Sequence, residues 1–194
     1  MTRGRLEAFS DGVIAIILTI MVLELRPPAG SALADLAPLL PKLLSYVLSF
    51  VFVAIYWNNH HHLLHAVERV NGRVLWANLH LLFWLSLVPF VTAWLGETGA
   101  ASLPVAVYGV VLLCAGTAYF ILTRALLALH PPGSALAEAL GADWKGKLSV
   151  VVYALAVPLA FPYRLGAIAL YVAVALVWLV PDLRFERVLE RDRR

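Results

Sequence analysis

Six apolar segments alternate with short polar stretches along the chain, and each spans or nearly spans a bilayer when it is helical. They lie at residues 9–25, 39–64, 73–95, 103–128, 147–161 and 164–181. This pattern predicts an all-α integral membrane protein with six transmembrane helices. We expect one six-helix domain over residues 1–181 and a charged cytoplasmic tail over residues 182–194.

Prolines divide the apolar pattern into helices. Pro27 and Pro28 end the first segment, and Pro41 suits the first turn of the second. Pro89 lies late in the third segment, where its missing N–H predicts a kink. Pro162 marks a tight connection between the last two segments.

The composition agrees with a membrane protein. Hydrophobic residues make up 62% of the 194 positions and charged residues 14%, whereas soluble domains average about 45–50% and about 25%. The mean hydropathy is +0.84 and the isoelectric point is near 9.2. The basic residues lie mostly at segment ends rather than in one patch. This distribution argues against a nucleic-acid partner and leaves the lipid bilayer as the partner of the apolar surface.

The Lys and Arg residues also predict the orientation. With six spans, three of the 15 basic residues fall at one face of the membrane, namely Arg26, Lys42 and Arg164. The other twelve fall at the opposite face, together with both chain ends. We therefore expect a multi-pass protein of the cell membrane with both termini cytoplasmic.

The N-terminus allows another interpretation. Two arginines, an apolar stretch and the small residues of 29–34 (AGSALA) imitate a cleavable signal peptide. Polar residues argue against cleavage, because Ser10 and Asp11 interrupt the entry to the apolar stretch and 24–26 (ELR) breaks the approach to the cleavage site. We expect the first segment to remain as a membrane helix.

A polar motif stands where the first segment enters the membrane. Arg5, Phe9, Ser10 and Asp11 form R-x-x-x-F-S-D, and a charge at such a place requires a partner or water. Ser10 and Asp11 also suit a helix N-cap. By the predicted topology, 57–61 (WNNHH) and 76–80 (WANLH) lie at the same end of the membrane. We expect a buried network between Asp11 and an imidazole or amide of these segments.

One face of the first segment carries a hydroxyl among apolar residues. Gly12, Ile16, Thr19 and Leu23 follow spacings of four, three and four, and Ile20 lies at the edge of their face. One interpretation is a pore wall with apolar collars at Ile16, Ile20 and Leu23 and a ring of hydroxyls from Thr19. The other is ordinary packing, with Thr19 bonded to a carbonyl one turn back. Periodicity leaves both open.

The outer end of this segment carries a carboxylate. Glu24 either lines an outer vestibule that concentrates cations or pairs with Arg26.

The histidines between His60 and His65 invite two further hypotheses. His61, His65 and Glu68 share a helical face and suit zinc, although the catalytic glutamate of H-E-x-x-H is missing. Asp11 and these histidines also suit a proton relay in a small proton-coupled or cation transporter, although no charged residue lies mid-membrane. We expect neither a resident metal nor another cofactor.

The motifs of several protein classes are missing from the chain. It lacks a nucleophile elbow, a phosphate loop and a dinucleotide fingerprint, so we expect no enzyme. It also lacks TVGYG, which excludes a standard potassium filter.

Taken together, the N-terminal motifs resemble those of the transmembrane protein 175 family of potassium channels. The matching residues are Arg5-x-x-x-Phe9-Ser10-Asp11-Gly12 with Ala15, Ile16 and Thr19, then 57–61 (WNNHH), Trp76-x-Asn78 and 89–92 (PFVT). The resemblance covers about residues 1–95, and beyond them only the number of spans matches.

The resemblance implies a potassium channel with a modest preference for potassium over sodium. Six-helix chains of this kind form homotetramers in which the first helix of each subunit lines a central pore. Ile16 corresponds to the narrowest apolar collar of the gate, and Ile20 and Leu23 to further layers. Thr19 corresponds to the hydroxyl layer linked with potassium selectivity.

The resemblance also implies how the pore helix is anchored. The R-x-x-x-F-S-D motif contacts histidine, tryptophan and asparagine partners in this family, and the candidates here are His61, Trp76 and Asn78. His62 and His65 depart from the family's pattern, so the identity of the pairing histidine stays open.

Overall fold

The computed structural model describes residues 2–67, 69–131, 133–134, 136–137 and 143–179, and the predicted tail over 182–194 lies outside them. The fold is all-helical, as expected. The membrane segments consist of α1 (Arg3–Leu23), η1 (Leu33–Leu39) with α2 (Leu40–His65), α3 (Gly72–Ser86) with α4 (Val88–Glu97), α5 (Ser102–Leu127), α7 (Trp144–Leu159) and α8 (Arg164–Leu179).

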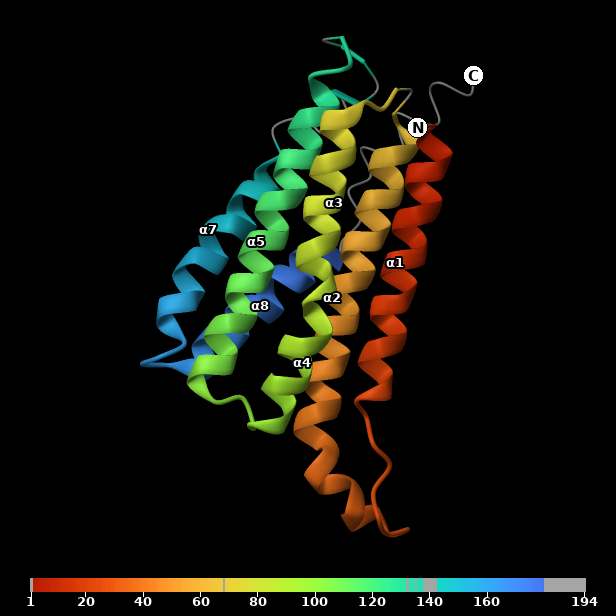
Figure 1. Cartoon of the computed structure of the whole chain (residues 1–194). Helices are drawn as coiled ribbons and strands as arrows, with labels where there is room; N and C mark the ends of the chain where they lie inside the picture. The colour runs from red at the N-terminus through yellow and green to blue at the C-terminus, as the bar shows by residue number, and fades with distance from the viewer. Residues whose placement is uncertain (1, 68, 132, 135, 138–142, 180–194) are drawn as a thin grey trace.

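These helices form an elongated bundle with α1 at one edge (Figure 1). α1 packs against α2, α3 and α4, whereas α5 packs against α3 and α7, and α7 against α8. The beginning of α1, the end of α2 and the beginning of α3 meet at the upper end of the view. The polar motif and its predicted partner segments therefore lie at one end of the bundle.

In the part of the chain that the structure describes, four helical segments are long and apolar enough to cross a membrane. They are Arg3–Leu23, Leu33–His65, Gly72–Glu97 and Ser102–Leu127, and Arg164–Leu179 is a shorter apolar helix. α7 and α8 have 16 residues each, or about 24 Å at 1.5 Å per residue. They are slightly short for a typical hydrocarbon core of about 30 Å.

The first helix begins earlier than predicted. We expected it to start at residue 9, but α1 starts at Arg3, and Thr2 is its N-cap residue. Ser10 and Asp11 thus lie inside the helix, and the N-cap interpretation of these two residues was wrong. The physical reason is tertiary packing. Leu6 lies one turn before Ser10 and is buried on the same face, so packing against the bundle extends the helix toward the N-terminus through a polar stretch.

The predicted kink at Pro89 is confirmed. α3 ends at Ser86 and α4 begins at Val88, with Leu87 between them. Proline has no N–H to donate and its ring clashes with the carbonyl four residues earlier, so the straight helix cannot continue. The resulting bend brings α4 close to α2, where a Cβ on Gly96 would stand 2.8 Å from Lys42 Cα.

Buried hydroxyls join three helices in the half of the bundle away from the motif. Thr92 Oγ1 donates to Ser49 Oγ at 2.7 Å and lies 2.6 Å from the carbonyl of Val88, and Ser49 Oγ lies 2.9 Å from the hydroxyl of Tyr108. This cluster links α2, α4 and α5 with no contribution from α1.

Candidate ion pathway and the network that holds α1

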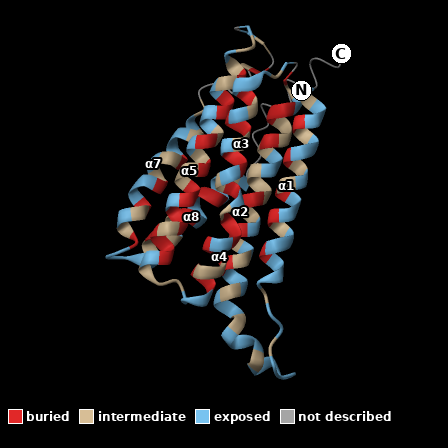
Figure 2. Cartoon of the chain, in the orientation of Figure 1, coloured by how far each residue is buried: buried red, intermediate tan, exposed pale blue. Residues whose placement is uncertain are grey.

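α1 has two distinct faces. Its buried residues follow a helical stripe and face α2, α3 and α4; they are Leu6, Ser10, Ile14, Ile17 and Met21. The predicted pore residues lie on the other side, where the exposed fractions are 59% for Ile16, 44% for Ile20 and 77% for Leu23. Figure 2 shows this exposed side of α1 at the edge of the bundle. One chain therefore does not enclose the predicted pore wall but presents it outward.

From the sequence, Thr19 was considered either as part of a pore wall or as bonded to a backbone carbonyl one turn back, and the structure shows this bond on a residue that faces outward. It is exposed on the outward face, and its Oγ1 donates to the carbonyl of Ile16 at 2.8 Å. A hydroxyl that donates its hydrogen bond to a backbone carbonyl still has its oxygen lone pairs available to accept. The bond to the helix thus leaves an acceptor oxygen on the outward face, which is what a cation requires.

A buried chain of hydrogen bonds ties the other side of α1 to the bundle. His60 Nε2 donates to Asn78 Oδ1 at 2.7 Å, and Asn78 Nδ2 donates to Ser10 Oγ at 2.9 Å. Ser10 Oγ in turn donates to the carbonyl of Leu6 at 2.8 Å. His60, Asn78 and Ser10 are at most 1% exposed. Each group in this series donates to the next, so no proton is shared. The series of hydrogen bonds fixes the positions of α2, α3 and α1 relative to one another.

A second, more exposed set of contacts joins α1 to α2 beside the buried chain. Trp57 Nε1 donates to Asp11 Oδ1 at 3.0 Å, and His61 Nδ1 lies 3.2 Å from Glu7 Oε1. The ring of His61 stacks between those of Trp57 and His65, with centroids 5.9 Å from each. These contacts hold the beginning of α1 against the last two turns of α2.

An arginine closes the end of α2. Arg3 Nη1 lies 3.2 Å from the carbonyl oxygens of both His65 and Val67. A guanidinium at a helix C-terminus satisfies free carbonyls and complements the helix dipole. Arg5, the arginine of the motif, is exposed instead and shares the outward face with Phe9.

The structure thus brings some predicted partners to the motif but not others. Asn78 contacts Ser10 as part of the buried chain. His61 reaches Glu7 rather than Asp11, and its neighbour His60 occupies the buried position. Trp76 is 74% exposed and forms no hydrogen bond with the motif in the described part of the chain, whereas Trp57 bonds Asp11. Within one chain, the tryptophan that bonds the motif is therefore Trp57 rather than Trp76. The histidine in the buried network is His60 rather than His61.

Sequence reasoning had a signal for His60. The buried face of α2 includes Ser49, Phe52 and Val53, and it continues to His60 seven residues beyond Val53. Helical periodicity repeats closely after seven residues, so it favours His60 over His61 for the buried side. No comparable pattern distinguishes Trp57 from Trp76.

The structure also places the residues of the remaining hypotheses. Glu24 is exposed and ends α1, and no ion pair with Arg26 occurs in the described part of the chain. Glu68, the third member of the zinc hypothesis, lies outside the described residues. Among those that are described, no group of three or more histidine, cysteine or acidic side chains is arranged to hold a metal.

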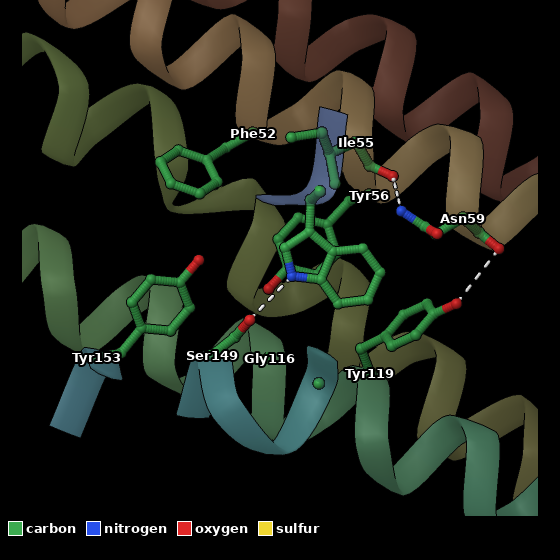
Figure 3. Close-up of a pocket in the computed structure, with 10 residues that line it drawn as sticks. Phe52, Ile55, Tyr56, Asn59, Gly116, Tyr119, Ser149 and Tyr153 are labelled. Atoms are coloured by element: carbon green, nitrogen blue, oxygen red, sulfur yellow. Dashed lines mark hydrogen bonds between the residues drawn. The ribbon is translucent and has the colours of Figure 1, made fainter. Parts of the chain in front are cut away.

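A small cavity lies on the other side of α2, between α5 and α7 (Figure 3). Its volume is about 40 Å³, and the aromatic residues Phe52, Tyr119 and Tyr153 line it together with Asn59. A cavity of this size holds water but no larger ligand. None of its lining residues belongs to α1, so the cavity is separate from the predicted pore wall.

Comparison with known proteins identifies the family. Residues 5–89 match the family described as the endosomal/lysosomal potassium channel TMEM175. A potassium channel from Chryseobacterium sp. (strain P1-3) is 52% identical over 192 residues, covering 99% of this chain and 100% of that protein. The chain belongs to the TMEM175 family.

More distant relatives agree with this assignment. A potassium channel from Streptomyces collinus is 36% identical over 124 residues, or 60% of each protein. The crystal structure of a lysosomal potassium-selective TMEM175 homolog from Chamaesiphon minutus matches with a TM-score of 0.80 at 26% identity, over 93% of this chain and 97% of that one. This chain is therefore a multi-pass membrane protein of a cation channel family and is not an enzyme, as the sequence predicted.

Proposed function

We propose that this chain forms a homotetrameric channel that conducts potassium with a modest preference over sodium. The observation that supports the proposal is the outward face of α1, where Ile16, Thr19, Ile20 and Leu23 are all exposed at the edge of the bundle. A pore on this face needs further copies of the chain, because a single α1 cannot surround an axis.

The proposed gate and filter follow from the chemistry of this face. Apolar rings at Ile16, Ile20 and Leu23 hold back water and ions by dewetting when they are narrow. Thr19 adds a ring of acceptor oxygens that replaces part of the hydration shell of a cation. Glu24, exposed at the end of α1, adds negative charge at the outer mouth and raises the local cation concentration.

The hydrogen-bond network gives α1 a fixed rotation. If α1 turned about its axis, the buried side chain of Ser10 would lose Asn78, and an unpaired buried group costs about 1–3 kcal/mol. The network thus keeps the apolar collars directed at the axis. Arg5 and Phe9 share the outward face, and we propose that they meet neighbouring subunits rather than α2 or α3.

The orientation is part of the proposal. Seven basic residues lie at the motif end of the described bundle, namely Arg3, Arg5, Arg69, Arg73, Arg124, Lys145 and Lys147. Three, Arg26, Lys42 and Arg164, lie at the other end. We infer a cell-membrane protein with both termini and the tail of 182–194 in the cytoplasm, and one transmembrane domain over 1–181.

Flux measurements test the proposed activity. Proteoliposomes of the purified chain should release potassium faster than sodium and faster than empty vesicles. Ile16→Asn makes the narrowest collar polar, so it should raise the potassium flux severalfold. Leu176→Asn is the matched control, because Leu176 is also exposed, at 59%, but lies on α8.

Two results would contradict the proposal. An Ile16→Asn flux equal to that of Leu176→Asn would remove the collar from the ion route. A potassium flux that follows an imposed proton gradient, with no single-channel currents in planar bilayers, would favour the transporter that uses Asp11 and the His60–His65 cluster.

A further inference from the structure

A wide groove runs between α3 and α5 at the motif end of the bundle, away from the outward face of α1. Its volume is about 730 Å³. Trp76 and Arg73 from α3 and Ile121 and Ala125 from α5 line it. The two helices lie side by side in Figure 1. The groove is open to the surface and far larger than the cavity behind α2.

The motif end of the groove is basic, with one arginine in its lining and a second beside a lining residue. Arg73 lines it in the first turn of α3, and Arg124 precedes Ala125 at the same end of α5. Both arginines are exposed. Neither forms an ion pair with another residue in the described part of the chain. Guanidinium groups at the same end of two neighbouring helices attract an anion.

The rest of the groove is apolar. Ala77 and Ala125 form the floor of the groove, and their small side chains leave space above them. Trp76, which is 74% exposed, forms a wall, and exposed tryptophan is typical of the membrane–water boundary. Further along the same faces, Phe83 and Val110 are exposed and extend the apolar surface away from the charged end.

His80, also in the groove, is bonded within its own helix. Its Nε2 accepts a hydrogen bond from Trp84 Nε1 at 2.9 Å. The groove therefore runs from the arginines at the motif end to a mostly apolar interior.

We propose that this groove binds one anionic phospholipid of the inner leaflet. The phosphate lies between Arg73 and Arg124, and an acyl chain lies over Ala77, Ile121 and Ala125 with Trp76 beside it. A charged head next to an apolar tail matches the gradient along the groove, and basic sites between transmembrane helices on the cytoplasmic side suit anionic headgroups. The assignment to the inner leaflet rests on the orientation proposed above.

The site also touches the element that holds the pore helix. Trp76 and Ala77 directly precede Asn78, whose amide bonds Ser10 of α1. A lipid in the groove therefore packs against the same turn of α3 that fixes α1, from the opposite side.

Native mass spectrometry of the detergent-solubilised assembly tests the proposal. The probes are phosphatidylglycerol and phosphatidylcholine with identical acyl chains. We expect phosphatidylglycerol to bind more tightly, and the double variant Arg73→Gln/Arg124→Gln to weaken that binding about 25-fold, at about fivefold per arginine. Arg164→Gln, an exposed arginine at the other end of the bundle, is the matched control and should leave binding unchanged.

A second variant tests the groove itself. Ala125→Leu fills the floor without changing charge, so it should weaken binding of both lipids alike. Because Ala125 is only half-buried, the assembly mass should stay the same.

Three results would overturn the proposal: equal binding of the two lipids by the unmodified protein, equal binding of phosphatidylglycerol by the double variant and Arg164→Gln, or a groove covered by another subunit. The last is seen as a disulfide cross-link between copies carrying Trp76→Cys and Cys114→Ala. Binding is read from mass and needs no current, so its failure and a failure of potassium conduction are separate results.

Discussion

At the scale of single residues, neighbouring side chains on one helix have different tasks. His60 and His61 are adjacent, yet the first is buried against Asn78 and the second is half-buried beside Glu7. The sequence predicted that a histidine and an asparagine meet the motif, and Asn78 does meet Ser10. The sequence could not predict the contact of Arg3 with the end of α2 or the bond from Trp57 to Asp11. Both depend on where the ends of α1 and α2 lie relative to each other.

The buried chain should contribute measurably to stability. Ser10→Ala leaves the amide of Asn78 without its acceptor and should cost about 1–3 kcal/mol per subunit, which lowers the melting temperature of the purified assembly. Ser86→Ala is the matched control, since Ser86 is exposed and bonds only the carbonyl of Phe83. The double variant Ser10→Ala/Asn78→Ala should cost less than the sum of its parts, because both remove one interaction. Equal melting of Ser10→Ala and Ser86→Ala would contradict this role.

The hydroxyl of Thr19 should affect ion preference. Thr19→Val keeps the shape of the side chain but removes the acceptor oxygen from the outward face of α1. We expect the potassium-over-sodium permeability ratio to fall toward one, measured as a shift in reversal potential under bi-ionic conditions. Thr117→Val is a control on α5, where the exposed hydroxyl likewise bonds a backbone carbonyl, that of Leu113. An unchanged reversal potential in Thr19→Val would exclude this oxygen from the filter.

At the scale of elements, the apolar pattern predicted the helices better than their ends. The break at Pro89 followed from the covalent structure of proline, which acts in any context. The start of α1 did not, because Leu6 and Ser10 are helical for their packing against α2 and α3 rather than for their own propensity. The sequence also gave no sign that Gly109 and Gly116, both on α5, differ in their surroundings.

Replacing each of these two glycines with alanine should have opposite effects on stability. A Cβ on Gly109 would overlap the hydroxyl of Tyr171, which bonds the carbonyl of Val105 at 3.2 Å, so Gly109→Ala should destabilise the packing of α5 and α8 by about 1–3 kcal/mol. A Cβ on Gly116 would stand 3.6 Å from the hydroxyl of Tyr56, an ordinary contact. Gly116→Ala should therefore be neutral or stabilising by up to about 1 kcal/mol through helix propensity. Thermal unfolding of both variants checks this, and a more stable Gly109→Ala protein would refute the close packing.

At the scale of the whole molecule, the bundle is asymmetric. One helix, α1, lies at its edge with one side packed and hydrogen-bonded to the bundle and the other directed outward, while α5, α7 and α8 pack together on the far side. The spacing of Ile16, Thr19 and Leu23 predicted that they share a helical face but left open whether that face is outward, and tetramerisation was predicted only through the family resemblance. No property of a single chain gives the number of copies, because that number depends on the angle at which neighbouring chains meet.

The most direct test of the account asks whether several copies of Ile16 meet on one axis. Ile16→Cys in a Cys114→Ala background places thiols at the proposed collar, and thiols from converging copies bind a soft divalent cation such as Cd²⁺ tightly. We predict that micromolar Cd²⁺ blocks the potassium current of this variant and that a chelator restores it, while Leu176→Cys in the same background stays open. A current through Ile16→Cys that Cd²⁺ leaves unchanged would contradict a pore lined by α1.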